Sequence, residues 1–233
     1  MLEINDVTVK FGGVRPVDGV TLTVTPGVTG LVGPNGAGKT TMLNVLSGFV
    51  IPVSGTVSFS GERLDGMAPH KRARWGIRRS FQQEQLVLSL TIRENVQVVV
   101  ENIGAPDSEI DRVLDAVELE QRDRAAGVLN IMERRLLEIA RAMVGHPKLV
   151  LLDEPGAGVA EAEAVRLVPL IRKMAEVEGT VVMLIDHDME LVQNVCRDLA
   201  VLDFGKLIAS GPTANVLNDP AVKRAYLGTV EVG

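Results

Sequence analysis

The sequence predicts an α/β protein in which a mostly parallel sheet carries a helical insertion, and three patterns indicate this. Two apolar runs, at 149–152 (LVLL) and 181–184 (VVML), have the length of buried strands and are followed by charged residues. A helical pattern at 161–177 separates them, as expected for parallel β-α-β units. The third pattern is the apolar spacing at 108–119 and 132–144, which is typical of helix faces.

The other segments extend this prediction along the chain. Residues 2–11 and 20–27 alternate between polar and apolar side chains as strands do. A short apolar strand at 28–32 runs into a glycine-rich loop, and a helix follows the loop. We therefore expect a mixed β region as far as Gly76, wrapped around one strand–loop–helix unit, and one small helix in the tail at 212–228.

The change of pattern along the chain predicts two structural parts. Residues 1–82 and 146–233 are expected to form a core that contains an N-terminal antiparallel β region, the parallel sheet and the tail. Residues 83–145 are expected to form an inserted α-helical subdomain, because their apolar positions follow helical spacing.

Composition excludes several classes of protein. A hydrophobic fraction of 46% in 233 residues excludes a disordered chain. The net charge of -6 argues against a nucleic-acid partner, which would favour a basic surface. No apolar run reaches the roughly 18–20 residues of a membrane span, and the start MLEINDVTVKF does not have the pattern of a signal peptide. Cys196 is the only cysteine, so a reducing cytosol fits; on its helical pattern it is interpreted as a small apolar side chain.

The glycine-rich loop matches G-x-x-x-x-G-K-[ST] in full, between a predicted strand and a predicted helix. Its backbone N–H groups and the helix N-terminus favour phosphate oxygens. Lys39 is expected to reach the β- and γ-phosphates, and the Thr40 hydroxyl to bind Mg²⁺. The alternative, a glycine-rich turn without ligand, does not account for both flanks. The candidate nucleotide-binding residues here are Gly33, Pro34, Asn35, Gly36, Ala37, Gly38, Lys39, Thr40 and Thr41.

Acidic side chains follow one predicted strand, and a histidine follows another. Asp153 and Glu154 come directly after LVLL, and His187 comes after VVMLID. In a parallel sheet, ligands bind beyond the carboxyl ends of the strands, which places Asp153 near the metal. Glu154 is expected to accept a proton from an attacking water, and His187 to contact the γ-phosphate. Taken alone, paired acids after a strand often mark only a helix start, and a lone histidine often serves packing or capping.

With these residues in place, the chain resembles the nucleotide-binding subunits of ABC transporters over essentially its whole length. GPNGAGKT is similar to the family's Walker A motif, LVLLDEP to its Walker B motif and IDHD to its switch histidine. The resemblance implies a RecA-like P-loop core, ATP and Mg²⁺ as cofactors, and Mg²⁺ held by Thr40, Gln82 and Asp153. RRSFQQ resembles the segment with the family's lid glutamine, here Gln82. The family resemblance also implies that Phe11 stacks on adenine. The alternative is that Phe11 is a core side chain.

The resemblance also implies partners and a location. Subunits of this family work as head-to-tail pairs on integral-membrane permease subunits, and a solute-binding protein contributes indirectly. We therefore expect a cytoplasmic protein, peripheral on the inner face of the cell membrane, with a permease docked beside Gln82 and the helical subdomain. KFGGVRPVDGV, LIDHDM and the ending LNDPAVKRAYLG most resemble ATPases of branched-chain amino-acid importers. Related amide and urea importers would look alike.

The chain departs from the family pattern at the signature LSGGQ, whose glycines approach the partner subunit's ATP. The register of LEIAR places this motif at Leu129 followed by Asn130, Ile131, Met132 and Glu133. The glycines have become Ile and Met, and the glutamine has become an anion that would repel phosphate. Asn130 and Glu133 are still expected to form a capping box. The loop at 156–160 (GAGVA) also ends without the usual carboxylate or amide.

Two functions fit this combination of intact and altered motifs. The first is an ATP-hydrolysing transporter subunit that pairs with a different ATPase subunit, since a homodimer would place the altered signature at both sites. The second is a regulatory or assembly subunit that binds nucleotide with little turnover of its own. The intact Glu154 and His187 favour the first, and the altered signature favours the second. Drift in a tolerant subfamily or a deliberate alteration would also produce the altered signature.

Overall fold

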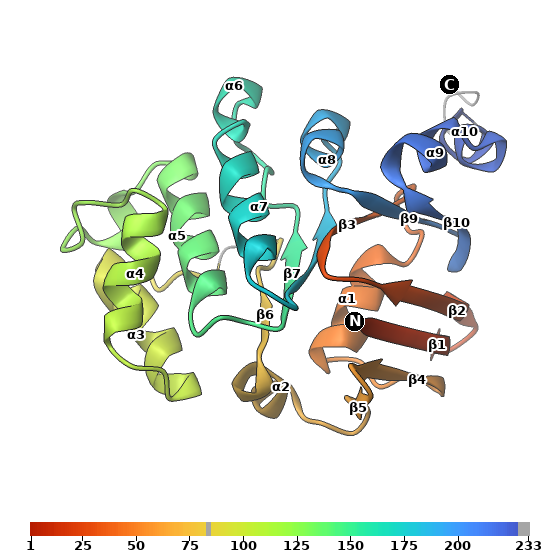
Figure 1. The fold of residues 1–233 in the computed structure, drawn as a ribbon, viewed down its shortest axis with the longest axis horizontal. Helices are drawn as coiled ribbons and strands as arrows, with labels where there is room; N and C mark the ends of the chain where they lie inside the picture. The colour runs from red at the N-terminus through yellow and green to blue at the C-terminus, as the bar shows by residue number, and fades with distance from the viewer. Residues whose placement is uncertain (83–84, 228–233) are drawn as a thin grey trace.

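The computed structural model describes residues 1–82 and 85–227, which form two β-sheets with helices around them (Figure 1). The predicted subdomain boundary at residue 83 and the tail residue Gly228 lie outside the described residues. The larger sheet has the strand order β10-β9-β3-β8-β7-β6, and the smaller one has the order β2-β1-β4-β5. The predicted α/β fold class is confirmed.

The larger sheet is parallel except at one edge. It contains β3 (Gly27–Val32), β6 (Ile77–Arg79), β7 (Leu149–Asp153), β8 (Val181–Ile185), β9 (Asp198–Asp203) and β10 (Lys206–Pro212). The β10 strand is antiparallel to β9, because only a short turn joins these two strands. Strands β3, β7 and β8 are almost entirely buried, which explains their continuous apolar sequences.

The smaller sheet is the predicted N-terminal antiparallel region. It contains β1 (Leu2–Phe11), β2 (Val14–Val24), β4 (Ser54–Phe59) and β5 (Glu62–Arg63). Helix α1 (Lys39–Ser47) follows β3 and packs between the two sheets, where Met42, Leu43 and Leu46 join one hydrophobic core. This arrangement holds the start of α1 at the carboxyl ends of the parallel strands.

Helices fill the chain between β6 and β7 in the described residues. They are α3 (Ile92–Ile103), α4 (Ser108–Ala116), the 3₁₀ turn η1 (Ala126–Val128) and α5 (Ile131–Met143). Figure 1 shows them together at one end of the molecule. Their apolar faces share a second hydrophobic core with strand residues such as Val150 and Val182, so the helices are packed onto the sheet.

Three local predictions were wrong. Residues 69–75, expected in the mixed β region, form helix α2 (Pro69–Trp75), with proline at its first position. The segment 161–177 forms two helices, α6 (Glu161–Ala164) and α7 (Leu167–Glu176), because Pro169 cannot donate to the carbonyl four residues earlier.

The tail also contains two helices instead of one. These are α9 (Thr213–Asn218) and α10 (Pro220–Leu227), and Pro220 makes the preceding residue extended. Helix α8 (Met189–Val195) completes the set of helices named in Figure 1.

Arg72 connects the C-terminal end of α1 to the segment that follows β5 of the smaller sheet. Its Nη1 donates to the carbonyls of Val45 and Leu46 at 2.7 Å each. Its Nη2 donates to Leu64 O at 2.7 Å, and its Nε donates to Met67 O at 2.9 Å. The buried guanidinium therefore satisfies carbonyls that the end of the helix leaves open, with a charge that suits the helix dipole.

We expect Arg72→Met to lower the free energy of unfolding by about 3 kcal/mol, because several buried carbonyls lose a charged donor. Urea denaturation of the purified chain measures this change. Arg74→Met is the matched control, since Arg74 is exposed on the same helix and donates from Nε to a single carbonyl, that of Asn102. Equal loss of stability in the two variants would contradict this role of Arg72.

Candidate functional site

The glycine-rich loop passes close to the backbone of both sheets. A Cβ on Gly33 would lie 2.0 Å from the Leu202 carbonyl oxygen, and one on Gly38 would lie 1.9 Å from that of Pro16. Both glycines also have a positive φ, 148° and 103°, which side chains disfavour. The loop therefore holds its curled path only with glycine at these two positions.

Lys39 closes the loop upon itself. Its Nζ donates to the carbonyl oxygens of Gly33 at 2.7 Å and Pro34 at 2.9 Å. Burial lowers the pKa of Lys39, while the carboxylates of Glu154 and Asp153 act in the opposite direction. The ammonium group is thus fixed at the loop, next to the acids that follow β7.

A cleft of about 540 Å³ opens above this loop and brings most of the predicted site residues together. Its lining residues are Pro16, Asn35, Gly36, Ala37, Gly38, Lys39, Thr40, Thr41, Gln82, Glu154 and His187. Asp153, Gly33, Pro34 and Phe11 are not among them. The side chain of Phe11 is 54% exposed at the end of β1, so the alternative of a core side chain is wrong.

Glu154 lies at the centre of the acidic side of the cleft. Its Oε2 accepts from Gln82 Nε2 at 3.2 Å, and its Oε1 lies 3.0 Å from His187 Nε2. The residue has a φ of 52°, unusual for a side chain with a Cβ, and its N–H donates to Ile185 O at 2.8 Å. The chain thus turns sharply after β7, and this turn directs the carboxylate into the cleft.

Asp153 is only 3% exposed and has a partner that the sequence analysis missed. Its Oδ2 accepts from Arg79 Nη2 at 3.1 Å, and its N–H donates to Ser80 Oγ at 3.0 Å. Burial raises the pKa of Asp153, and the hydrogen bond from Arg79 acts against that rise. Because β6 pairs with β7, the position of Arg79 on a strand next to the acids could have indicated this contact.

Arg79 also binds the P-loop helix. Its Nη1 donates to Asn44 Oδ1 at 2.6 Å and to Ser47 Oγ at 2.8 Å, both on α1. Its Cζ lies 4.7 Å from the centre of the Phe81 ring. One buried guanidinium therefore connects α1, β6 and the aspartate at the end of β7.

The altered signature begins an intact helix. Asn130 caps α5 through its side chain, which accepts from Glu133 N at 2.9 Å, and Glu133 Oε2 accepts from Asn130 N at 2.9 Å. The predicted capping box is confirmed. Arg124 adds a contact that the sequence analysis missed, because it donates to Glu133 Oε1 at 2.6 Å and to Oε2 at 3.2 Å. The negative charge of Glu133 is therefore compensated within the chain.

The loop after Glu154 is fixed from two sides. Arg135 on α5 donates to Ala157 O through Nε at 3.2 Å and through Nη2 at 2.9 Å. On the other side, Gly156 N donates to Asp186 Oδ2 at 3.1 Å. Asp186 lies just before the switch histidine, and burial raises its pKa. The two altered segments, the signature and this loop, are thus joined directly by α5.

The ion pair of Glu133 predicts a pH-dependent stability. The hydrogen bond from Arg124 lowers the pKa of Glu133 below its usual value of 4.5, so its stabilisation is present above that value and disappears as the pH falls through the lowered pKa. Glu133→Gln keeps the cap but removes the charge. We expect it to lower stability by about 0.5 kcal/mol near pH 7 and by progressively less as the pH falls from 4.5 through the lowered pKa. Thermal melts across this range test the prediction, and a difference independent of pH would contradict it.

Comparison with known proteins agrees with a P-loop ATP-binding protein. Residues 17–157 match the family described as ABC transporter, and residues 206–232 match the family described as branched-chain amino acid ATP-binding cassette transporter. The chain is 36% identical to the high-affinity branched-chain amino acid transport ATP-binding protein BraF of Pseudomonas aeruginosa, over 98% of both chains. It is 35% identical to LivG of Escherichia coli K12, again over 98% of both chains.

One relative bears the name of a different transport system, one for export of lipopolysaccharide. The lipopolysaccharide export system ATP-binding protein LptB of Haemophilus influenzae is 33% identical over 98% of this chain and 97% of LptB. Among solved structures, a nucleotide-free ATP-binding cassette from an ABC transporter has a TM-score of 0.85 at 29% identity, covering 97% of this chain and 98% of its own. A cassette in its ADP conformation has a TM-score of 0.86 at 29% identity, covering 98% of both chains.

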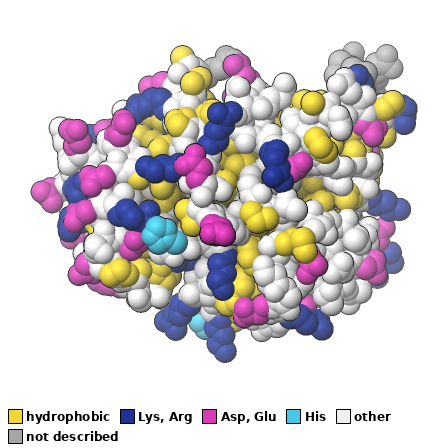
Figure 2. Space-filling model, viewed as in Figure 1, with side chains coloured by type: hydrophobic (Ala, Val, Ile, Leu, Met, Phe, Trp, Pro, Cys, Tyr) yellow, Lys and Arg dark blue, Asp and Glu magenta, His cyan; other side chains and the backbone are white. Residues whose placement is uncertain are grey.

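The fold and the cleft define a P-loop nucleotide-binding protein, and the comparisons give its family. The chain belongs to the ABC transporter family, in which it is an ATP-binding, ATP-hydrolysing subunit. Within residues 1–82 and 85–227, no helix is long and apolar enough to cross a membrane. On the face shown in Figure 2, basic and acidic side chains are interspersed.

Proposed function

We propose that the cleft binds Mg-ATP and hydrolyses it with Glu154 as the general base. The observation that carries this proposal is the convergence of Lys39, Glu154 and His187 on one cleft from three separate elements. Lys39 would exchange its loop carbonyls for the γ-phosphate, and His187 would contact the same phosphate. Glu154, now between Gln82 and His187, would accept the proton of the attacking water.

The residues predicted to hold Mg²⁺ fit that ion by their chemistry. Thr40, Gln82 and Asp153 offer a hydroxyl, an amide oxygen and a carboxylate, and Mg²⁺ prefers oxygen ligands. Thr40 and Gln82 line the cleft, and Asp153 lies beside it as the partner of Arg79. Bound Mg²⁺ would supply positive charge that neutralises the phosphates during transfer. Phe11, exposed at the end of β1, is proposed to stack on adenine.

We expect Glu154→Gln to keep ATP binding but to slow hydrolysis by about 100-fold or more, because the amide cannot accept the proton. Calorimetry measures binding, and phosphate release measures turnover. Lys39→Ala is the control that loses binding, since it removes the fixed cation of the loop. Hydrolysis of Glu154→Gln at the wild-type rate would exclude Glu154 as the base.

The same site is proposed to power import of branched-chain or related amino acids through integral-membrane permease subunits. BraF and LivG carry that activity in their names, and the match at 206–232 agrees with it. The chain would lie in the cytoplasm, peripheral on the inner face of the cell membrane, with a solute-binding protein acting indirectly from the other side. Uptake of labelled leucine by cells with and without the gene tests this assignment.

We further propose that this chain pairs with a different ATPase subunit. Its own cleft contains Lys39, Glu154 and His187, whereas its signature has Ile131 and Met132 at the positions where the family pattern has glycines. Met132 is buried, but the Ile131 side chain is exposed at the start of α5, where it would hinder the approach of the backbone to a partner's phosphate. The ion pair with Arg124 offsets the charge of Glu133, but it does not restore this backbone approach. The second candidate, a regulatory subunit with little turnover, is favoured by the same alteration. ATPase assays of the chain alone and mixed with candidate partner ATPases separate the two.

We expect the Glu154→Gln variant to stay monomeric in the presence of ATP. The same variant is expected to dimerise when the signature is restored to the family pattern by four further substitutions, Asn130→Ser, Ile131→Gly, Met132→Gly and Glu133→Gln. Size-exclusion chromatography measures the difference. Because Met132 is buried, its loss costs about 2–4 kcal/mol of stability, so a variant with only Ile131→Gly and Glu133→Gln serves as a milder repair. Equal dimerisation with the natural signature would show that the variant motif is tolerated.

A further inference from the structure

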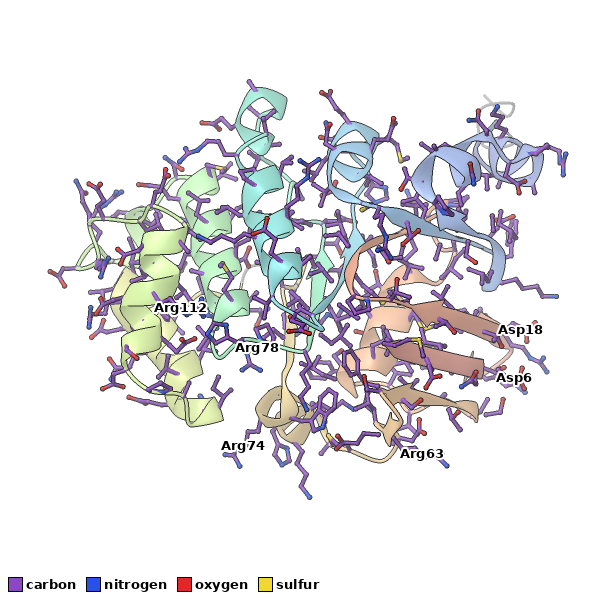
Figure 3. All side chains as sticks on the ribbon, in the orientation of Figure 1. Asp6, Asp18, Arg63, Arg74, Arg78 and Arg112 are labelled. Carbon is purple, nitrogen blue, oxygen red and sulfur yellow. The ribbon has the colours of Figure 1, made fainter. Side chains whose placement is uncertain are left out.

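A buried carboxylate that the proposed hydrolysis does not use lies beside the nucleotide cleft. Asp186 follows β8 and is only 7% exposed. By contrast, Figure 3 shows Asp6 and Asp18 at the outer margin of the smaller sheet. In the part of the chain that the structure describes, Asp186 forms no ion pair and does not line the cleft. A buried carboxylate without a cation is unfavourable, and such a group often marks a functional site.

Three backbone N–H groups surround this carboxylate. Its Oδ2 accepts from Gly156 N at 3.1 Å, and its Oδ1 accepts from Asp188 N at 3.0 Å. The N–H of His187 also donates to it. These bonds favour the ionised form, whereas burial raises the pKa of Asp186. Two of the three N–H groups belong to the turn of the switch histidine, and the third belongs to the loop after Glu154.

The two segments that Asp186 joins leave neighbouring strands. Asp153 on β7 pairs with Ile185 on β8, and Glu154 N donates to Ile185 O at 2.8 Å. Both strands end at this point. The Asp186 carboxylate then provides a further connection, one residue beyond the end of β8. This connection lies next to the pair of side chains in which Glu154 Oε1 is 3.0 Å from His187 Nε2.

We propose that Asp186 is a positioning residue for ATP hydrolysis, which holds the loop after Glu154 and the turn of His187 at a fixed separation. The proposal rests on the proposed role of Glu154 as the general base. Asp186 acts through these two residues, since it does not itself line the cleft. Misplacement of a reacting group by about 1 Å costs on the order of 100-fold in rate, so one hydrogen bond that fixes the loop has a measurable effect.

The loop at 156–160 depends on side chains from other segments to hold its path. It has no carboxylate or amide side chain of its own. Arg135 donates to Ala157 O, and Asp186 accepts from Gly156 N. A Cβ on Gly156 would lie 3.1 Å from Asp186 Oδ2, closer than an ordinary van der Waals contact. Because the carboxylate and the loop backbone are in such close contact, a shift of one displaces the other.

Two substitutions remove the bond between Asp186 and Gly156 in different ways. Asp186→Ser keeps an acceptor for the local N–H of Asp188 but is too short to reach Gly156. Asp186→Asn has one amide oxygen, so when that oxygen accepts from Asp188 N, its NH₂ group faces the Gly156 N–H. Asp188→Asn is the matched control. It removes a charge from the same turn, while its amide oxygen still accepts from Glu190 N and Leu191 N.

Amide hydrogen exchange, followed by NMR on the nucleotide-free chain, measures whether Asp186 holds the loop. We expect the Gly156 N–H to exchange about tenfold faster in Asp186→Ser than in the wild-type chain, because it loses its acceptor. Asp188→Asn is expected to leave this rate unchanged. An unchanged rate in Asp186→Ser would overturn the proposal, and Asp186→Asn provides the same test if Asp186→Ser does not fold.

Turnover separates a positioning role from a merely structural one. The variants are assayed with the partner ATPase that gives the wild-type chain its highest rate, below their measured melting temperatures. We expect Asp186→Ser to lower kcat about tenfold and to change KM for ATP by less than about twofold, because the phosphate loop is untouched. Asp188→Asn is expected to keep both constants. Faster exchange at Gly156 with an unchanged kcat would show that the bond is only structural and would overturn the proposal.

Failure of this proposal is distinguishable from failure of the proposed function. A wild-type chain that hydrolyses no ATP with any partner would overturn the proposed function, and this inference with it. A wild-type chain that hydrolyses ATP with the same kcat as Asp186→Ser would overturn the role of Asp186 alone. A loss in Asp186→Ser that appears only as a higher KM would assign Asp186 to nucleotide binding and would likewise contradict the positioning role.

Discussion

The glycine-rich loop passes between the two sheets so closely that a carbonyl from each sheet touches it. Pro16 lies on β2 of the smaller sheet and Leu202 lies on β9 of the larger one, and both approach the α-carbon region of a loop glycine. Gly205 N adds a hydrogen bond to Ala37 O at 3.1 Å. The loop is therefore the joint between the sheets as well as the phosphate-binding element. Helix α1 can pack between the sheets only because this joint leaves its N-terminus at their common edge.

Arg79 connects several elements around the nucleotide cleft. Its guanidinium connects the P-loop helix to the aspartate at the end of β7, and its side chain also lines the cavity of about 240 Å³ between the helices and the sheet. The Phe81 ring lies against it and makes an edge contact with Phe49 at 5.8 Å. A buried ion pair gains little net stability, but loss of one partner leaves the other charge uncompensated, so buried Asp153 depends on Arg79. Arg79 therefore links the position of Asp153 to that of the P-loop helix.

The altered signature has a clearer physical interpretation in the structure than in the sequence. Sequence reasoning predicts repulsion between Glu133 and phosphate, whereas the structure pairs that carboxylate with Arg124 and with the start of α5. The replacement of glycine by Ile131 thus becomes the stronger argument for an impaired signature, since this side chain is exposed at the start of α5 whereas Met132 is buried in the core. Arg135 joins this helix to the loop after Glu154, so the two departures from the family pattern belong to one connected surface.

The sequence by itself determined the elements whose signal is local. The P-loop, the strand that ends in Asp153 and Glu154, and the capping box of Asn130 are recognisable because each needs particular residue types at fixed short spacings. The split helix at Pro169 was also present in the sequence, although it was not predicted. Tertiary structure alone decided the partners of Asp153 and Glu133 and the contact of Asp186 with Gly156. These contacts join residues that are distant in sequence, and their pairing depends on strand order and helix packing, which no local pattern encodes.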